Sequence, residues 1–212
     1  VWGVGEFTTD RDDVTYIQCE SETHLLKEFL VFWEKHQPDV ITGWNTEFFD
    51  IPYLCNRITH LFGEDEIKRL SPWGSVQGRD IYKMGRNHQT YNIQGVAALD
   101  YFDLYRKFTY TAQESYRLDH IAKVELGESK DGNPYDTFRD WYTKDFQSFI
   151  EYNIQDVEIV DKLEDKMKLI ELCLTMAYDA KVNYTDVLGS VRYWDVLIYN
   201  HLREKNIVIP QK

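Results

Sequence analysis

The sequence predicts an α/β fold, because a short apolar run typical of a strand is followed by stretches with the periodicity of helices. Residues 40–44, Val-Ile-Thr-Gly-Trp, are typical of a buried strand. In residues 53–62, apolar side chains recur every three to four positions, as they do on one face of a helix. The longest periodic stretch, residues 143–178, predicts a long helix toward the C-terminal end.

Composition indicates a globular protein, and its length suffices for one substantial core or for one domain with an appendage. Of the 212 residues, 43% are hydrophobic and 15% are aromatic. The net charge of −12 argues against nucleic-acid binding through bulk positive charge, but it is compatible with an enzyme that gathers carboxylates around cations.

Cysteine usage and the absence of sorting signals predict an intracellular protein. The cysteines, Cys19, Cys55 and Cys173, have no paired spacing and resemble buried thiols in a reducing compartment. The sequence has no signal peptide or transmembrane run. Because it begins with Val1 rather than methionine, we expect a piece of a longer polypeptide.

The N-terminal third predicts the order ββαβα. Residues 1–8 and 14–19 are interpreted as two strands of a hairpin, joined by an acidic turn at residues 10–13. Ser21 or Thr23 can cap the helix that follows, which carries an apolar stripe.

Residues 64–97 form a polar stretch interrupted by glycines, and they predict a β-hairpin. Gly85-Arg86-Asn87 has the composition of a hairpin tip, and aromatic residues flank it on both sides. The stretch is locally basic, so a nucleic-acid contact and an ordinary solvated hairpin remain equally open.

The second half predicts mainly helices. Residues 96–105 are interpreted as a core strand that runs into a helix, and residues 116–126 as a helix that Gly127 ends. A polar loop over residues 128–135 precedes the long periodic stretch. Residues 186–205 again have helical character.

Two carboxylates stand out by their position. Asp50 lies where the strand at residues 40–44 passes into the next helix, and ligands of open α/β sheets bind at such strand ends. Taken alone, it is more simply explained as a helix cap. Asp156 lies four residues after Tyr152, so both project from one helical face, although a surface aspartate is the simpler reading of Asp156 alone.

The two motifs together resemble a known family. Asn-x-x-x-Phe-Asp at residues 45–50 and Tyr-x-x-x-Asp at residues 152–156 resemble the second and third exonuclease motifs of the family B DNA polymerases. Other phrases resemble most the T-even-type bacteriophage members; they lie at residues 41–45, 49–53, 68–72, 99–108, 194–195 and 206–211. The resemblance spans essentially the whole chain.

This resemblance implies an RNase H-like (DnaQ-like exonuclease) fold, a mixed sheet flanked by helices, with an inserted β-hairpin and a long C-terminal helix. Residues 1–180 would then form a partial 3′→5′ exonuclease domain, with the hairpin region at 64–97. Residues 181–212 would be a helical connector toward a palm domain.

The resemblance also implies a proofreading exonuclease within a replicative DNA polymerase. Two Mg²⁺ or Mn²⁺ ions, about 3.5–4 Å apart in such sites, would assist hydrolysis of the 3′-terminal phosphodiester. The implied partners are primer-template DNA with a frayed 3′ strand and the remainder of the polymerase. The location would be the cytoplasm of a host bacterium, away from any membrane.

Roles for single residues follow from the same resemblance. Asp50 and Asp156 would be catalytic metal ligands, and Tyr152 would position the attacking water or the scissile phosphate. The DNA-binding candidates are Asn45 and Phe49 in the single-strand pocket, Arg86 at the hairpin tip, and Lys130 in the loop before the last motif.

The sequence departs from the family pattern at one important point. The first exonuclease motif, Asp-x-Glu, has no equivalent here, since Glu6 lacks an aspartate two residues before it. Two carboxylates should hold hard cations weakly, so we expect the isolated chain to be inactive or nearly so.

The alternative of another class is a non-catalytic module that binds single-stranded DNA or packs within a polymerase. An unrelated phosphatase or hydrolase has little support, because no glycine-rich phosphate loop, G-x-S-x-G or HExxH appears.

Overall fold

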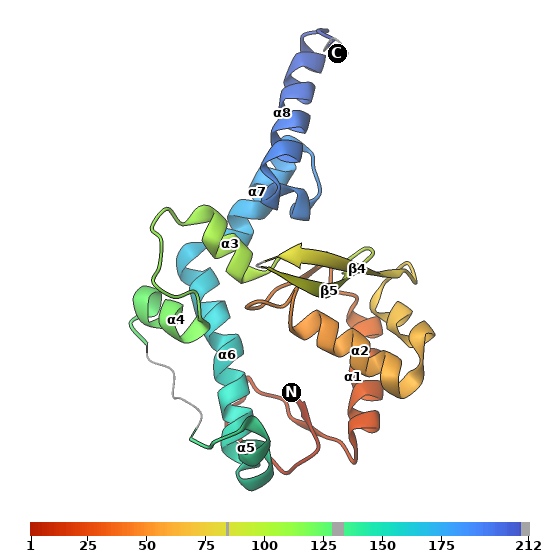
Figure 1. Cartoon of the computed structure of the whole chain (residues 1–212), viewed down its shortest axis with the longest axis vertical. Coiled ribbons are helices and arrows are strands. Elements are labelled where there is room, and N and C mark those ends of the chain that lie inside the picture. The colour runs from red at the N-terminus through yellow and green to blue at the C-terminus, as the bar shows by residue number, and fades with distance from the viewer. Residues whose placement is uncertain (84, 129–133, 209–212) are drawn as a thin grey trace.

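The computed structural model describes residues 1–83, 85–128 and 134–208. Its long axis follows three successive helices: α6 (Phe146–Met167), α7 (Leu169–Ala180) and α8 (Ser190–Glu204). Figure 1 shows α1 (Glu22–His36) and α2 (Asp50–Phe62) to one side of this axis. The chain is a mixed α/β structure, as the sequence predicts.

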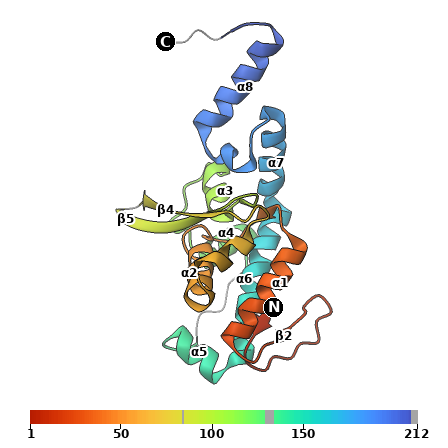
Figure 2. The same ribbon diagram turned by 90° about the vertical axis from the view of Figure 1, so that its right-hand side faces the viewer.

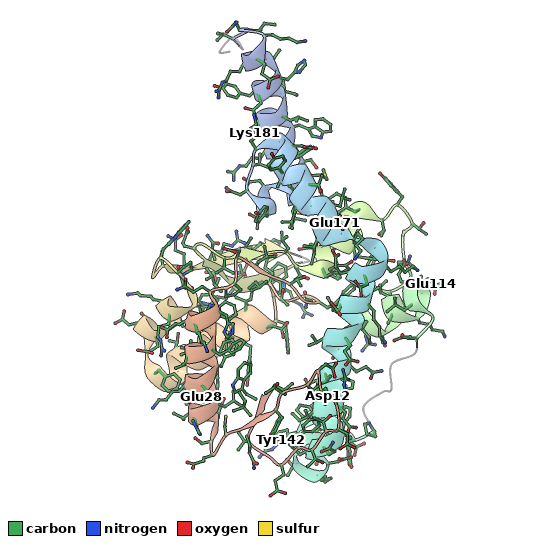
Figure 3. The ribbon with its side chains drawn as sticks, turned by 180° about the vertical axis from the view of Figure 1, so that it is seen from behind. Asp12, Glu28, Glu114, Tyr142, Glu171 and Lys181 are labelled. Atoms are coloured by element: carbon green, nitrogen blue, oxygen red, sulfur yellow. The ribbon has the colours of Figure 1, made fainter. Side chains whose placement is uncertain are left out.

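The N-terminal strands differ from the prediction. Strand β1 (Trp2–Gly3) pairs with β2 (Ile17–Gln18) in parallel, so residues 1–19 do not form the predicted antiparallel hairpin, and Glu6 lies outside any strand. The connecting loop turns back against α6, where Thr8 and Gln147 exchange hydrogen bonds of 3.0 and 2.8 Å. Figure 3 shows Asp12 of this loop beside α6. Contacts between residues that are far apart in the sequence therefore determine that β1 and β2 pair in parallel.

The strand at residues 40–44 is short but lies where the sequence predicts it. Strand β3 (Val40–Ile41) pairs in parallel with β6 (Ala97–Ala98). Helix α2 and a 3₁₀ helix, η1 (Glu64–Leu70), follow β3 along the chain, and α3 (Tyr101–Phe108) follows β6. The predicted passages from strand to helix are thus confirmed at both places.

Strands β4 (Val76–Lys83) and β5 (Arg86–Ile93) form an antiparallel ladder. Gly85 has a φ of 76°, the left-handed conformation that a tight connection between two strands requires. Figure 2 shows the β4–β5 pair extending away from the body of the molecule.

The predicted long helix at residues 143–178 is not continuous: residues 143–144 end α5 (Phe138–Lys144), and α6 and α7 follow. It breaks at Lys168, which adopts a φ of 56° and donates its backbone N–H to the Glu164 carbonyl at 2.8 Å. The Glu164 carboxylate then accepts the N–H of Ile170 at 3.0 Å, which satisfies an N-terminal amide of α7. Apolar spacing continues across the break, which explains why periodicity alone predicts one helix.

The remaining helices are α4 (Leu118–Leu126), α5 (Phe138–Lys144) and the 3₁₀ helix η2 (Tyr184–Leu188). Gly127 ends α4 with a φ of 72°, as predicted. The predicted helix at residues 186–205 is confirmed over residues 190–204 by α8, which contributes no buried residue, whereas residues 186–188 belong to η2. None of the described helices is long and apolar enough to cross a membrane.

Two apolar clusters organise the molecule. One joins α3, α4, α6, α7 and η2 around residues such as Tyr101, Ile159 and Leu163. The other joins α1, α2, η1 and β5 around residues such as Leu30 and Ile58. Strand β3 lies between them, because Val40 packs against the first cluster and Ile41 against the second.

The described strands form three separate two-stranded sheets rather than one continuous mixed sheet. The β3–β6 pair lies at the junction of the two apolar clusters. Asp50 and Asp156 come from helices on opposite sides of this junction.

Candidate functional site

Asp50 is the first residue of α2 and does not cap it. The N-cap position belongs to Phe49, and no side-chain hydrogen bond caps the helix. The capping interpretation of Asp50 is therefore wrong. Pro52 fits the first turn because its missing N–H would have no helical partner there.

The structure brings Asp50 and Asp156 into electrostatic range of each other. Although much of residue Asp50 is exposed, partial burial of its carboxyl group raises the pKa, and the nearby charges of Asp100 and Asp156 raise it further. A bond from its own backbone N–H acts in the opposite direction. On α6, Asp156 is half-buried, with one carboxylate oxygen out of contact with solvent. Carboxylates crowded in this way favour a bound cation or proton.

The loop before Asp50, residues 45–49, is anchored by Asp100. This aspartate is only 3% exposed, and it lies between β6 and α3. Its carboxylate accepts the backbone N–H of Asn45 at 2.8 Å and that of Glu47 at 3.1 Å. It also caps α3 by accepting the N–H of Phe102 at 3.0 Å. Burial raises the pKa of Asp100 while these three N–H groups oppose the rise.

The β4–β5 ladder holds the other side of the same loop. The Thr90 hydroxyl, which is fully buried, donates to the Glu47 carbonyl at 3.0 Å. The Arg79 guanidinium donates to the Glu47 carboxylate at 2.8 Å, and the rings of Phe48 and His88 lie 5.1 Å apart. The hairpin is therefore joined directly to the loop that leads to Asp50.

Tyr152 lies in an aromatic cluster built by α5 and α6. Its ring centroid is 4.7 Å from that of Trp141 and 6.2 Å from that of Phe138. Trp141 also contacts Phe149, at 5.9 Å, and donates its indole N–H to the Ser148 hydroxyl at 2.6 Å. These contacts restrict the position of the Tyr152 phenol one turn before Asp156.

The predicted DNA-binding residues are distributed unevenly. Phe49 is 68% exposed, so its ring is free to stack with a base, and Asn45 lies on the same loop. Arg86 is exposed at the hairpin end, opposite Lys83 in the ladder. Lys130 lies outside the described residues.

A cleft of about 1330 Å³ lies next to this loop. Glu47, Arg79 and Asp100 are among its lining residues, together with residues of η2 and α8. Asp50 and Asp156 do not line it. The candidate site is therefore the surface between α2 and α6, distinct from this cleft.

The side chains in place fit a divalent metal only in part. Within residues 1–83, 85–128 and 134–208, no group of three or more His, Cys, Asp or Glu side chains could hold a metal ion. Asp50 and Asp156 offer oxygen ligands of the right chemistry, but a hard cation requires more of them.

Sequence reasoning did not assign roles to three residues of the site: Asp100, Thr90 and Trp141. Asp100 follows a strand and begins a helix, which is a recognisable capping signal. The contacts of Thr90 and Trp141 depend on tertiary packing, and no local pattern predicts them.

The sequence is similar to those of known DNA polymerases. The family model of the DNA polymerase family B exonuclease domain matches residues 6–121. The DNA-directed DNA polymerase of Escherichia phage RB69 is 41% identical over 202 residues, which are 94% of this chain and 22% of that polymerase. The DNA-directed DNA polymerase of Enterobacteria phage T4 is 38% identical over 202 residues, 95% of this chain and 22% of that protein.

A more distant relative is the DNA polymerase catalytic subunit of Equine herpesvirus 1 (strain Ab4p), 29% identical over 210 residues, 92% of this chain and 17% of that subunit. The chain thus spans about a fifth of the length of the two phage polymerases. The family match covers more than half of the sequence, and the phage relatives align over nearly all of it. The chain belongs to the family B DNA polymerases, and its residues 6–121 match their exonuclease domain.

Proposed function

We propose that this chain provides the 3′→5′ proofreading exonuclease site of a replicative DNA polymerase. The observation that carries the proposal is the electrostatic interaction of Asp50 with Asp156, which come from helices of two different apolar clusters. A merely structural module has no need to hold Asp50 where burial, and in addition the charges of Asp100 and Asp156, raise its pKa.

In this proposal, Asp50 and Asp156 hold divalent metal, Mg²⁺ or Mn²⁺. When bound, such metal would activate water and stabilise the charge on the leaving 3′ oxygen. Because the two carboxylates fit a metal site only in part, the family's Asp-x-Glu segment has to complete it. We therefore propose that the chain alone is inactive or nearly so and binds metal weakly. Within a complete RNase H-like exonuclease sheet, it would be active.

The chain's other residues bind and orient the substrate. Phe49 stacks on a terminal base of the frayed 3′ strand, and Asn45 hydrogen-bonds in the same pocket. The Tyr152 phenol, held by its aromatic cluster, hydrogen-bonds the attacking water or a phosphate oxygen. Arg86 contacts DNA at the end of the hairpin, and Lys130 approaches the scissile phosphate.

The rest of the polymerase and a primer-template are the proposed partners. Residues 1–180 would form the exonuclease part, and residues 181–212 would lead toward the palm. The setting would be the cytoplasm of an infected bacterium. The RB69 and T4 relatives, which are phage polymerases, support this setting.

Degradation of a 3′-overhang oligonucleotide tests the proposal. We would compare this chain, with Mg²⁺ or Mn²⁺, with a longer polypeptide that includes an Asp-x-Glu segment. We expect cleavage only by the longer protein, and loss of that cleavage in Asp50→Ala and Asp156→Ala. Asp195→Asn, which changes an exposed carboxylate on α8, is the matched control.

Three outcomes would count against the proposal. Cleavage by the short chain that both alanine variants abolish would refute its inactivity. If the longer protein cleaves normally with either alanine, the exonuclease assignment fails. Single-strand binding without cleavage in the longer protein would favour the non-catalytic alternative.

A further inference from the structure

We propose that Asp100 and Thr90 are positioning residues that clamp the loop 45–49 from opposite sides and so hold Asn45, Phe49 and Asp50 in the arrangement needed for cleavage. This inference rests on the proposed exonuclease function. It adds that the β4–β5 hairpin acts on the site through this loop as well as through its exposed tip.

Asp100 fixes the loop from the side of β6 and α3. A buried carboxylate is unfavourable unless hydrogen bonds compensate it, and here three backbone N–H groups do so. One oxygen accepts the N–H groups of Asn45 and Phe102, and the other accepts the N–H of Glu47. A single side chain therefore connects the end of β6, the start of α3 and the loop.

Thr90 fixes the loop from the side of the hairpin. Its hydroxyl bonds the Glu47 carbonyl, while the Glu47 N–H bonds Asp100. Arg79, which faces Thr90 across the ladder, bonds the Glu47 carboxylate. Glu47 is thus held through its amide, its carbonyl and its side chain, three residues before Asp50.

The loop turns sharply at its first residue. Asn45 has a φ of 65°, a left-handed conformation that asparagine adopts more readily than other residues with a side chain. The N–H of Asn45 points at Asp100, and its carbonyl accepts the N–H of Phe49 at 3.2 Å. A shift in the position of Glu47 would therefore also move Phe49 and Asp50.

The conservative variant Asp100→Asn separates positioning from folding. Its remaining oxygen can still accept the N–H groups of Asn45 and Phe102, so the cap of α3 is retained. Its new NH₂ group would face the Glu47 N–H, and two donors cannot bond each other. Thr90→Val removes only the hydroxyl bond to the Glu47 carbonyl and gives a second variant, should Asp100→Asn fold poorly.

Amide hydrogen exchange on this chain gives a readout that does not depend on activity. We expect exchange at Glu47 to become at least about tenfold faster in Asp100→Asn, while Phe102 stays protected. In Thr90→Val we expect faster exchange at Asn45 and Glu47. Asp195→Asn should leave all of these rates unchanged. Unchanged rates at Asn45 and Glu47 in both variants would overturn the clamp.

The full polymerase polypeptide gives the second readout, single-turnover cleavage of a 3′-overhang. We expect a rate about ten- to a hundredfold lower for Asp100→Asn and a smaller loss for Thr90→Val, because small displacements of reacting groups are costly. Leu163→Val, a core variant that removes none of the loop's hydrogen bonds, controls for lost stability when the assay temperature is set equally far below each variant's melting temperature.

The outcomes separate this inference from the proposed function. If Asp50→Ala and Asp156→Ala abolish cleavage while both clamp variants keep the full rate, the clamp alone is wrong. If Leu163→Val slows cleavage as much as Asp100→Asn, the effect is one of stability and the clamp is again wrong. If Asp50→Ala and Asp156→Ala cleave normally, the proposed exonuclease function itself is wrong.

Discussion

Trp141 should contribute strongly to stability because it is the centre of the cluster around Tyr152. It is 3% exposed and contacts the rings of Phe138, Phe149 and Tyr152. Replacing it with phenylalanine removes the indole N–H bond to Ser148, about 1 kcal/mol. The smaller ring also leaves a cavity, for about 1–2 kcal/mol more.

The free energy of unfolding should therefore fall by about 2–3 kcal/mol in Trp141→Phe. In a domain of this size, that lowers the melting temperature by about 4–12 °C. Urea unfolding followed by circular dichroism at a helix wavelength measures the free energy, and a thermal melt measures the temperature.

Two further variants test the contribution of the hydrogen bond and the effect of burial separately. Ser148→Ala removes only the acceptor of the indole bond, so it should cost about 1 kcal/mol. Trp194→Phe makes the same substitution on α8, where the side chain is 56% exposed, and should change stability by less than about 0.5 kcal/mol. If Trp141→Phe is as stable as Trp194→Phe, the cluster does not support the fold or Tyr152 as argued.

Three further predictions concern the core, the backbone and pH. Leu163→Ala should cost about 3 kcal/mol in urea unfolding because the side chain is fully buried, and Leu172→Ala, 41% exposed, less than about 1 kcal/mol; equal losses would contradict the assigned core. In the same assay, Gly95→Ala should destabilise the protein more than Gly63→Ala does. Both glycines have positive φ, but only at Gly95 would the new Cβ lie 2.6 Å from a proline ring. Equal losses of stability would exclude that clash. Asp50→Asn should raise the melting temperature at pH 7 without divalent metal, because the fold raises the pKa of this carboxyl and so disfavours its ionised form. The gain should disappear as the pH falls below the ordinary aspartate value of about 4, and a less stable variant at pH 7 would contradict the pKa argument.

Local chemistry explains which elements could be predicted from the sequence. Ser21 caps α1 by accepting the N–H of His24, and Gly127 ends α4 in a left-handed conformation. Both signals act within one helical turn, so tertiary structure does not alter them. The hairpin at Gly85 is of the same kind.

Two predictions were wrong, the continuous long helix and the N-terminal hairpin, because the observed structure there depends on contacts that reach beyond one helical turn. The break at Lys168 depends on the Glu164 carboxylate, which accepts amides of the next helix, and the spacing of apolar residues does not register it. The parallel pairing of β1 and β2 depends on how the intervening loop packs on α6. Such side-chain capping and loop packing have no fixed spacing in the sequence.

The candidate site was predictable mainly through its resemblance to a family. Taken alone, Asp50 is better explained as a cap and Asp156 as a surface residue. Their electrostatic contact depends on the two apolar clusters packing on either side of β3. No local pattern in the sequence encodes that packing.

Helix α8 has a consequence for how the chain comes apart. Because none of its residues is fully buried and only half-buried side chains such as Tyr193 pack on the first apolar cluster, opening it exposes less apolar surface than opening a core helix does. Its exposed Val191, Trp194 and Ile198 add little to its attachment. A protease should therefore cut within α8 from a partly open state, at a rate set by this local opening rather than by global unfolding. The trimmed product should keep the loop 45–49 and the aromatic cluster around Tyr152 intact.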